Sequence, residues 1–563
     1  MMVQAIKKSF SQELVIFVLC MSVYSFFFGF FKFFSLLSSR FILFFGLDQL
    51  SLDLIYLVYC WSLLLLPLLF IFRLFFVDDW KYLKLRVLAL RYSIYLCLYT
   101  WFLPFFYIMQ NGGKLGVCWC VNDFSIGDFS LGLQNGSVSS FFVDHIYNWV
   151  VEWNIYYHLG VDGISILFIL LTTILIPVCI LCSWETFLVL PGAKWFLILL
   201  FFMEFCLLNV FFILDLLLFF IFFEGILIPM FLIIGVWGSR YRRIYASYVF
   251  FLYTMFGSVF LLVSILFFYQ EVGTTDFWFY DLFGVSSTWV QLGLFIGFAV
   301  KVPLVPVHLW LPEAHVEAPT SGSVILAGIL LKIGGYGLYR FSVFSNEQIA
   351  MLAFYLGMFG VIYSGLATFQ QVDLKKIIAY SSIGHMGVAV MGLASNTDIS
   401  LQGGVLVMFA HGFVSSALFI CVGILYDRYG TRLLVYYGGL AEVMPIFSVV
   451  FLFFILANYA FPGTGNFMGE FILLLSTVPF TGMVGYIAMG SLFGTWFSLA
   501  IFGRLCTGPI RVFFFKKSVE MVSDINLREF MILLILGLPT IFSGVQPDFV
   551  LELVSLSFMQ GIR

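Results

Sequence analysis

Apolar runs about 20 residues long recur along nearly the whole chain, and this feature limits the possible folds more than any other. A helix needs roughly 20 apolar residues to cross the hydrocarbon core of a bilayer. Fifteen such runs occur, at 14–35, 54–77, 87–109, 163–183, 195–213, 214–236, 246–269, 288–307, 320–341, 349–370, 374–396, 402–426, 446–475, 482–503 and 529–546. We therefore expect an all-α polytopic membrane protein with about 15 transmembrane helices.

The composition supports this class of protein. The 563-residue chain is 62% hydrophobic and 10% charged, and its mean hydropathy is +1.08, whereas soluble domains contain about 25% charged residues. The net charge of −3 gives no sign of a nucleic-acid partner. The N-terminal "MMVQAIKKSF" resembles neither a transit peptide nor a signal peptide with a cleavage site, so we expect the first apolar run to remain as a span.

The cysteines indicate packing rather than chemistry. Cys179 and Cys182 have CxxC spacing, but they lie inside an apolar run with no second pair nearby, so we expect both to pack in the core. Cys118 and Cys120 lie in a long polar loop, where a disulfide is left open. We expect the two histidines of that loop, His145 and His158, to be surface residues.

Basic residues separate the connections between runs into two sets. The connections at 270–287, 342–348, 397–401 and 476–481 contain no Lys or Arg. The opposite connections contain Lys7, Lys8, Lys81, Lys84, Arg86, Arg240, Arg242, Arg243, Lys375, Lys376, Arg428, Arg432, Arg504, Arg511, Lys516 and Lys517. Because basic loops remain on the inner side of a membrane, we expect the N-terminus inside and the C-terminus outside. The long loop at 110–162 is then also outside.

Several ionisable side chains lie inside these apolar runs. At the bilayer centre such a group costs about 2.5–3.5 kcal/mol to insert. Six stand out, with Glu204 as an outlying seventh: Glu224, Lys301, Lys332, His385, His411 and Glu470. One such group alone often forms a buried ion pair that holds helices together, but this many of mixed sign favour a functional role.

Carboxylates, amines and imidazoles in series are the groups that a proton relay needs. Moving a carboxylate toward or away from a buried lysine loads or unloads its proton. Imidazole changes charge near neutral pH and passes protons in either direction. The mid-span groups therefore indicate proton transfer.

Two of the charged groups lie beside residues that break helices. Pro303 and Pro306 follow Lys301, and the segment Pro462–Gly465 precedes Glu470. Within a membrane, a helix is broken only where protein or water satisfies the freed backbone groups. Such breaks at corresponding places in two halves of a chain indicate the ion site of a transporter built from repeats.

The spacing of these groups predicts an internal repeat. Glu470 follows Lys301 by 169 positions, and His385 follows Glu224 by 161 positions. The similar offsets favour two tandem five-helix units at about 195–341 and 349–503. A nucleotide-binding loop at Gly463–Gly469 is excluded, because the glycine spacing is one residue too long for GxGxxG and no strand precedes it.

Four motifs around these residues are specific: "FFEGILIPMFLIIGVWG" from Phe222, "FAVKVPLVPVHLWLPEAHVEAPTSGSVILAGILLKIGGYGLYRF" from Phe298, "QVDLKKIIAYSSIGHMG" from Gln371 and "FPGTGNFMGEF" from Phe461. Together they resemble the antiporter-like subunit 4 family of the proton-pumping NADH:ubiquinone oxidoreductase, respiratory complex I. The resemblance extends over about 160–547. It implies an antiporter-like fold of fourteen core helices, with two inverted five-helix repeats that each contain a discontinuous helix.

The resemblance also implies a role for each charged residue. Glu224 matches the carboxylate that pairs with the pump lysine, and Lys301 matches that lysine. Lys332 matches the bridging lysine, His385 and His411 match histidines of the second repeat, and Glu470 matches the carboxylate of its broken helix. Glu204 matches a carboxylate that many members share.

The family context implies the location, partners and cofactors. We expect a multi-pass protein of the mitochondrial inner membrane, with its N-terminus on the matrix side and its C-terminus on the intermembrane side. The implied partners are other membrane-arm subunits, including neighbouring antiporter-like subunits, and lipids such as cardiolipin. No cofactor is expected in this chain; NADH, FMN, iron–sulfur clusters and ubiquinone belong to other subunits.

The two ends of the chain lie outside the repeats. Residues 1–110 form N-terminal helices with one span more than the family has, and 111–162 form the outer-side loop. Residues 163–194 form a linking helix, and 504–563 form a C-terminal loop and helix. The added span and the loop depart from the family pattern.

Other functions fit parts of this pattern. A subunit of a multi-subunit sodium/proton antiporter shares the architecture, although a lysine is expected there at the position of Glu470. A plastid-type homologue that uses ferredoxin and plastoquinone also fits. A structural scaffold predicts instead that the mid-span charges can be lost without effect.

Overall fold

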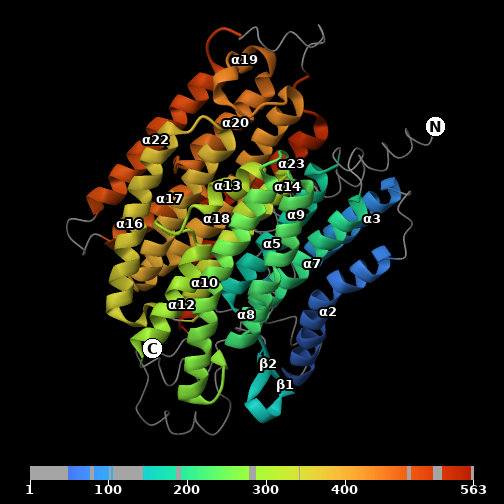
Figure 1. The fold of residues 1–563 in the computed structure, drawn as a ribbon, viewed down its shortest axis with the longest axis vertical. Coiled ribbons are helices and arrows are strands. Elements are labelled where there is room, and N and C mark those ends of the chain that lie inside the picture. The colour runs from blue at the N-terminus through green and yellow to red at the C-terminus, as the bar shows by residue number, and fades with distance from the viewer. Residues whose placement is uncertain are drawn as a thin grey trace.

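The computed structural model describes residues 49–75, 82–100, 103–104, 144–184, 192–277, 287–341, 343–477, 484–510 and 523–559, and these residues are almost all helical (Figure 1). The predicted span at 14–35 and the cysteines Cys118 and Cys120 lie outside the described residues. The same holds for the two ends of the chain, so the expected sides of the termini stay predictions.

The elements of the first part of the chain run to η3. They are α2 (Gln49–Phe75), α3 (Tyr82–Thr100), β1 (Asp144–Val150), η1 (Val151–Trp153), β2 (Ile155–Gly160), α5 (Gly163–Cys182), α7 (Ala193–Phe212), α8 (Leu216–Gly225), α9 (Leu227–Trp237), α10 (Arg243–Val272), α12 (Thr288–Lys301), α13 (Trp310–Glu317), α14 (Thr320–Ile325), η2 (Leu326–Leu330), α15 (Leu331–Arg340) and η3 (Val343–Ser345).

The remaining elements follow η3. They are α16 (Glu347–Gln370), α17 (Leu374–Ala394), α18 (Asp398–Tyr429), η4 (Leu434–Tyr436), α19 (Leu440–Val443), α20 (Pro445–Asn458), α21 (Gly465–Thr477), α22 (Val484–Cys506), α23 (Leu527–Val545) and α24 (Asp548–Met559).

Short polar side chains and glycines fix the ends of several helices. Asp162 accepts a hydrogen bond from Ser165 N at 2.9 Å and begins α5, and Thr397 caps α18 in the same way. These caps satisfy backbone N–H groups that the first turn leaves free. At the other end, Gly273 and Gly430 adopt φ values of 80° and 70° and end α10 and α18.

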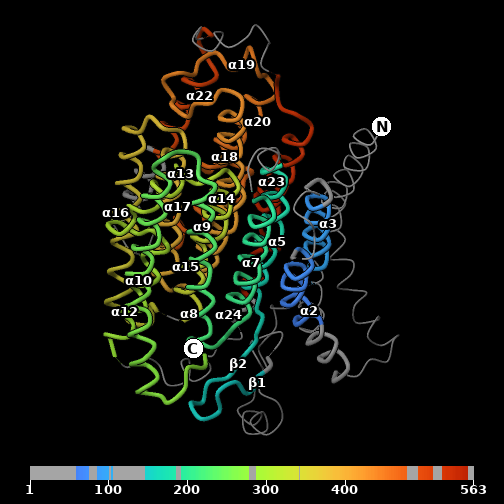
Figure 2. The backbone as a smooth tube through the Cα atoms, turned by 45° about the vertical axis from the view of Figure 1, so that its right-hand side comes forward, coloured from blue at the N-terminus to red at the C-terminus, as the bar shows by residue number. Residues whose placement is uncertain are grey.

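Nine helical segments in the described part of the chain are long and apolar enough to cross a membrane. They are buried to very different extents. The spans formed by α5, by α14 to α15 and by α18 are 100% buried in the protein, whereas that of α10 is 39% buried. Accordingly, α5 and α18 lie in the middle of the bundle, with α16 at one side and α2 and α3 at the other (Figure 2). The count of fifteen spans stays a prediction.

Two predicted spans are interrupted where the sequence analysis places the breaks. The chain leaves α12 at Lys301 and resumes as α13 at Trp310; likewise α20 ends at Asn458 and α21 begins at Gly465. A third irregularity is η2, a π-helical turn between α14 and α15. Turns of this kind are frequent at functional sites.

The loop expected at 110–162 contains regular structure at its end. Strands β1 and β2 form an antiparallel hairpin, with Asp144 opposite Gly160. The prediction that His158 is a surface residue is wrong: its side chain is fully buried, and its Nδ1 lies 2.8 Å from Asp276 Oδ1. The hairpin contacts the bundle through a backbone hydrogen bond, in which Leu214 N donates to His158 O at 3.0 Å. The side chain of His145 lies outside the described residues.

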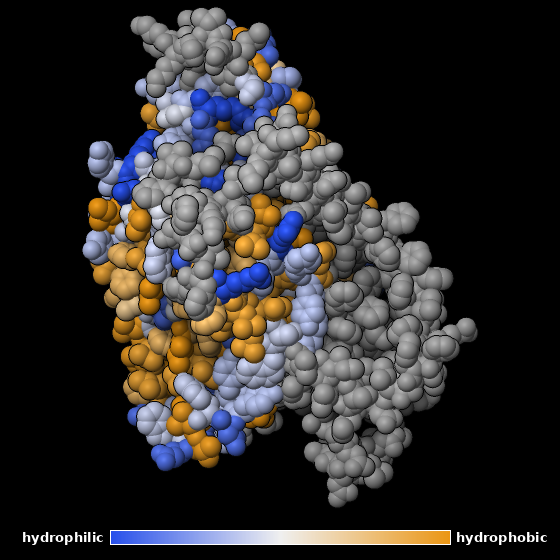
Figure 3. All heavy atoms as spheres, turned by 90° about the vertical axis from the view of Figure 1, so that its right-hand side faces the viewer, coloured by the Kyte–Doolittle hydropathy of each residue, from blue (hydrophilic) through white to orange (hydrophobic). Residues whose placement is uncertain are grey.

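The surface agrees with a protein that contacts lipid. On the face drawn in Figure 3, apolar side chains form a broad area in the lower half of the described part, and hydrophilic side chains gather mainly above it and at the lower end. The exposed side of α10 carries large apolar residues along its length, among them Leu252, Phe256 and Phe267.

Candidate functional site

The first group of mid-span charges is Glu224 and Lys301. Glu224 lies near the end of α8, and Lys301 is the last residue of α12. Their Oε1 and Nζ atoms are 3.8 Å apart. The Lys301 ammonium donates a hydrogen bond of 2.6 Å to the Phe223 carbonyl and lies 3.1 Å from the centroid of the Phe223 ring. The lysine is therefore held by the residue next to its carboxylate, and the carboxylate itself is not hydrogen-bonded to it.

The second group contains Lys332 and His411, which face each other from α15 and α18. Both side chains are buried, and Lys332 Nζ lies 2.9 Å from His411 Nδ1. Lys332 also donates to the carbonyl of Ala327 in η2. The π-helical turn thus supplies an acceptor to the amine.

His385 and Glu470 extend this second group. His385 Nδ1 lies 3.2 Å from Glu470 Oε1, and the His385 and His411 rings have centroids 5.1 Å apart. The order of groups is therefore Lys332, His411, His385 and Glu470, from α15, α18, α17 and α21. These four ionisable side chains form a polar line, with hydrogen-bond distances at its two ends and a contact between the two imidazole rings in the middle.

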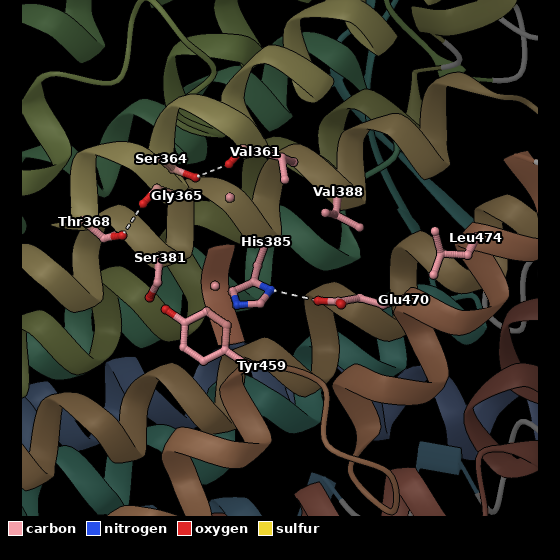
Figure 4. A pocket seen from close by; sticks show the side chains of 12 residues that line it. Val361, Ser364, Gly365, Thr368, Ser381, His385, Val388, Tyr459, Glu470 and Leu474 are labelled. Carbon is pink, nitrogen blue, oxygen red and sulfur yellow. Dashed lines mark hydrogen bonds and ion pairs between the residues drawn. The ribbon is translucent and has the colours of Figure 1, made fainter. Parts of the chain in front are cut away.

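A cavity of about 60 Å³ lies beside His385 and Glu470 (Figure 4). That volume has room for several water molecules. Its wall includes the hydroxyl groups of Ser364, Ser381 and Tyr459. In Figure 4 the His385 ring points toward Glu470 on one side and has Ser381 and Tyr459 on the other. Polar side chains and space for water thus meet at one end of the line.

The structure does not join all the predicted residues. Among the described residues, no hydrogen bond or ion pair links the Glu224–Lys301 pair to Lys332. Glu204, on α7, is fully buried, and neither of its carboxylate oxygens has a hydrogen-bond partner in the described part of the chain. Glu204 is therefore a separate buried carboxylate.

Two further buried histidines were not singled out from the sequence. His308 lies in the break after Lys301, and His315 lies on α13. Both ring nitrogens of each lack a hydrogen-bond partner among the described residues, and the His315 ring stacks on Phe419 with centroids 4.5 Å apart. The cost of burying ionisable groups, applied to the segment "VHLWLPEAHVE", would have identified both.

Buried charges also hold the two ends of the bundle. Arg340 of α15 donates to Asp162 at 2.8 Å and to the hydroxyl of Tyr336. At the other end, Arg432 donates to the Val316 carbonyl and lies 4.0 Å from both Glu317 and Asp373. Burial lowers the pKa of Arg432, and nearby Asp373 acts in the opposite direction. These contacts join segments far apart in the sequence.

Cysteine and metal chemistry find no support in the described regions. Cys179 is fully buried in α5, and its thiol donates to the Ser321 carbonyl at 3.6 Å, as expected for a packed core residue. Within the described ranges, no group of three His, Cys, Asp or Glu side chains could hold a metal ion.

Comparison with known proteins identifies the family. The family model for the transmembrane part of NADH:quinone oxidoreductase and Mrp antiporter subunits matches residues 214–498. The chain is 47% identical over 436 residues to NADH-ubiquinone oxidoreductase chain 4 of Chondrus crispus, covering 76% of this chain and 87% of that protein. It is 43% identical over 503 residues to the chain 4 protein of Prototheca wickerhamii, covering 87% and 92%.

Two solved structures share the fold. A chain of respiratory complex I from Thermus thermophilus with bound NADH superposes with a TM-score of 0.72 at 25% identity, covering 89% of this chain and 99% of that chain. A chain of the Mrp complex from Dietzia sp. DQ12-45-1b gives a TM-score of 0.66 at 19% identity, covering 74% and 86%. The chain therefore belongs to the NADH:quinone oxidoreductase/Mrp antiporter transmembrane family and groups within it with the NADH-ubiquinone oxidoreductase chain 4 proteins.

Proposed function

We propose that this chain carries protons across the mitochondrial inner membrane as a membrane-arm subunit of respiratory complex I. The observation that carries the proposal is the line of Lys332, His411, His385 and Glu470 beside a cavity that can hold water. NADH oxidation and ubiquinone reduction take place in other subunits, which hold FMN and the iron–sulfur clusters. Neighbouring antiporter-like subunits and membrane lipids such as cardiolipin are its immediate partners.

The hydrogen bonds of the line allow a proton to pass from Lys332 toward His385. When Lys332 is charged, it donates to His411 Nδ1, and the proton of a neutral His411 then lies on Nε2. When His411 accepts a proton from Lys332 at Nδ1, it releases the other from Nε2. That nitrogen has no hydrogen-bond partner in the described structure, and the His385 ring is the neighbouring imidazole. Glu470, bonded to His385 Nδ1, balances the charge that arrives there.

The pair Glu224–Lys301 forms the loading site of the first half in this scheme. Its separation of 3.8 Å is beyond a hydrogen bond, so a small shift of either helix changes the attraction between the two charges. The attraction favours the charged lysine. Separation of the pair then favours release of the lysine proton, although among the described residues no hydrogen bond or ion pair leads from Lys301 to Lys332. Glu204 is an additional buried carboxylate. No contact among the described residues connects it to this path, so we propose no step for it.

The arrangement of helices supports two five-helix repeats, at about 195–341 and 349–503. Each range contains one discontinuous helix, α12–α13 or α20–α21, as a repeat requires. We place residues 1–110 and 111–162 before them, 163–194 as a linking helix and 504–563 as a C-terminal element. Fifteen helices, with the N-terminus in the matrix and the C-terminus outside, complete the proposed topology.

Lys301→Ala and Glu224→Ala test the proposal. Each variant should assemble into the complex but reduce proton pumping coupled to NADH oxidation by at least about tenfold, because the relay loses a group that it needs at every turnover. Pumping is measured as quenching of a pH-sensitive dye in vesicles containing the purified complex. Cys179→Ala is the control, since this thiol packs in the core without touching the line. Unchanged pumping in both variants would favour a scaffold.

The alternative is a subunit of a multi-subunit sodium/proton antiporter. The family model covers both classes, and the likeness to the Mrp complex shows that the fold is shared. The carboxylate Glu470 in the broken helix favours complex I. Uptake of sodium ions by the same vesicles, driven by an imposed pH gradient without NADH, would favour the antiporter.

A further inference from the structure

An open groove of about 950 Å³ lies at one end of the bundle, apart from the proton line. Three connections between candidate spans meet there. They are 238–242 between α9 and α10, 371–373 between α16 and α17, and the segment after α18 that contains Leu433. Because each connection lies at the end of a candidate membrane span, we place the groove at the membrane surface.

The carboxylates that line the groove are already paired. Glu313 accepts a hydrogen bond from Lys376 at 2.7 Å. Glu317 and Asp373 each lie 4.0 Å from the guanidinium of Arg432, which is fully buried behind them. These acidic groups therefore offer little free negative charge to a ligand.

The basic side chains of the groove are in surplus. Arg240, Arg242 and Arg243 line the groove and lie within four consecutive positions of the sequence. Arg240 and Arg242 are exposed and form no ion pair among the described residues, and Arg243 donates only to the Gly238 carbonyl, at 3.1 Å. Guanidinium groups bind phosphate oxygens through several parallel hydrogen bonds. The groove is thus complementary to a phosphate group.

An apolar surface begins where the basic residues end. On α10, Ile244, Tyr248 and Leu252 follow Arg243 on one side of the helix and are 58%, 54% and 62% exposed. On the adjacent α9, Val236 is 52% exposed. Tyrosines at the membrane surface above an apolar stripe are typical of the interfacial region of a bilayer. An acyl chain can cover this apolar stripe and remove it from water, whereas a soluble phosphate compound has no apolar part that could do so.

We propose that the groove binds the phosphate of an anionic phospholipid through Arg240, Arg242 and Arg243, with its acyl chains along the exposed stripe of α9 and α10. Basic pockets at the ends of transmembrane helices are suited to such headgroups. The site holds a lipid at the end of α13, the helix that continues from Lys301. The proposal rests on the lipid contacts named in the proposed function and gives them a site; proton pumping does not enter its test.

The test uses the whole complex that contains this chain, in nanodiscs of phosphatidylcholine. A trace of phosphatidylglycerol with a photoactivatable acyl chain is added, and crosslinks to α9 and α10 are quantified by mass spectrometry. Each basic side chain contributes about fivefold to the binding of anionic lipid, so Arg240→Ala/Arg242→Ala should reduce crosslinking about tenfold or more. Arg504→Ala, an exposed arginine in the last turn of α22, should leave it unchanged.

Competition experiments on the unaltered complex test the proposal even if the variants fail to assemble. Unlabelled phosphatidylglycerol should compete with the crosslinking lipid, and phosphatidylcholine and inorganic phosphate should not. Competition by inorganic phosphate would overturn the proposal in favour of a soluble anion. Equal crosslinking by a photoactivatable phosphatidylcholine would overturn it too.

Discussion

At the scale of single residues, the ammonium of Lys301 is held mainly by groups other than its carboxylate. It donates to the Phe223 carbonyl and faces the Phe223 ring, while Glu224 stays 3.8 Å away. A carbonyl dipole and an aromatic face both stabilise a cation without accepting its proton. The lysine can therefore remain in one place while its partner carboxylate moves. Phe223 positions the ammonium, and the distance to Glu224 controls how strongly its charged form is favoured.

Glu470→Gln tests the other end of the line. Glutamine keeps the size and the hydrogen-bonding oxygen next to His385, but it cannot take up or release a proton. We expect assembled complex with proton pumping reduced at least about tenfold. Glu470→Asp, which keeps the carboxylate at shorter reach, should retain more pumping than Glu470→Gln. Proton pumping is measured by dye quenching in vesicles. Equal pumping by the two variants would show that the charge of this residue is not needed for proton transfer.

The sequence indicated which ionisable residues lie within apolar spans, because the cost of placing charge in lipid depends only on where a residue lies within an apolar run; their roles in proton transfer stay predictions. It could not predict which charges touch. Lys332 and His411 are 79 positions apart and meet only through the packing of α15 on α18. Glu204 satisfies the same cost argument as the others, yet the structure connects it to none of them.

At the scale of elements, both helix breaks are closed in the same way. The indole N–H of Trp310 donates to the Val300 carbonyl at 2.9 Å, and the amide of Asn466 donates to the Ala457 carbonyl at 3.0 Å. Each acceptor lies in the last turn before its break, where the interruption leaves carbonyls without a helical partner. A side chain beyond the break thus satisfies a carbonyl before it, and the buried interruption is tolerated.

Close approach of α23 also shapes the second break. Gly463 adopts φ of 93°, and a Cβ atom added to Gly544 would lie 2.3 Å from the Gly463 carbonyl oxygen. Only a residue without a side chain allows α23 this close to the broken segment. The break was predictable from Pro462 and its glycines, but this contact was not, since it depends on a helix about 80 positions later.

Gly544→Ala should therefore displace the broken segment and with it Glu470. We expect pumping to fall several-fold, with a smaller loss of assembled complex, because small-to-large changes in packed interiors cost about 1–3 kcal/mol. Gly537→Ala is the matched control on α23, since its added Cβ would meet nothing closer than 3.6 Å. Pumping in vesicles and the amount of complex on a native gel are measured together. Equal effects of the two substitutions would contradict the role of the contact.

At the scale of the whole molecule, α5 is the centre around which both proposed repeats pack. Its span is completely buried, although its sequence alone is indistinguishable from that of a lipid-facing helix. Apolar runs predict that a helix crosses the membrane, but in lipid a core helix and a peripheral one are equally apolar. For this reason the nine long apolar helices in the described part of the chain agree with predicted runs to within a few residues, whereas their order from centre to edge could not be predicted.

One buried ion pair ties α5 to the proton line. Asp162, which caps α5, and Arg340, at the end of α15, are 178 positions apart, and their side chains are 4% and 3% exposed. Arg340 also donates to Tyr336, which lies one turn after Lys332 on α15. The pair therefore fixes the helix that carries Lys332 against the central helix of the bundle.

Asp162→Ala should greatly reduce the amount of assembled complex. Removing Asp162 takes away the carboxylate that the buried Arg340 guanidinium contacts at 2.8 Å. Loss of one partner of a buried ion pair typically costs about 3–5 kcal/mol, and this substitution also removes the cap of α5. Glu313→Ala is the matched control. Its pair with Lys376 is 33% and 29% exposed, and exposed pairs contribute about 0–1 kcal/mol, so assembly should be nearly unchanged. Assembly is measured on native gels of solubilised membranes.

The double variant Asp162→Ala/Arg340→Met separates the charge from the cap. Replacing both partners removes the buried guanidinium together with its carboxylate, so assembly should recover in part relative to Asp162→Ala. Pumping per assembled complex should stay below that of the unaltered protein, because α15 has lost the contact that positions Lys332 against α5. Full recovery of assembly and of pumping would mean that the ion pair neither stabilises the bundle nor positions the lysine, and that α15 is held by its apolar contacts alone.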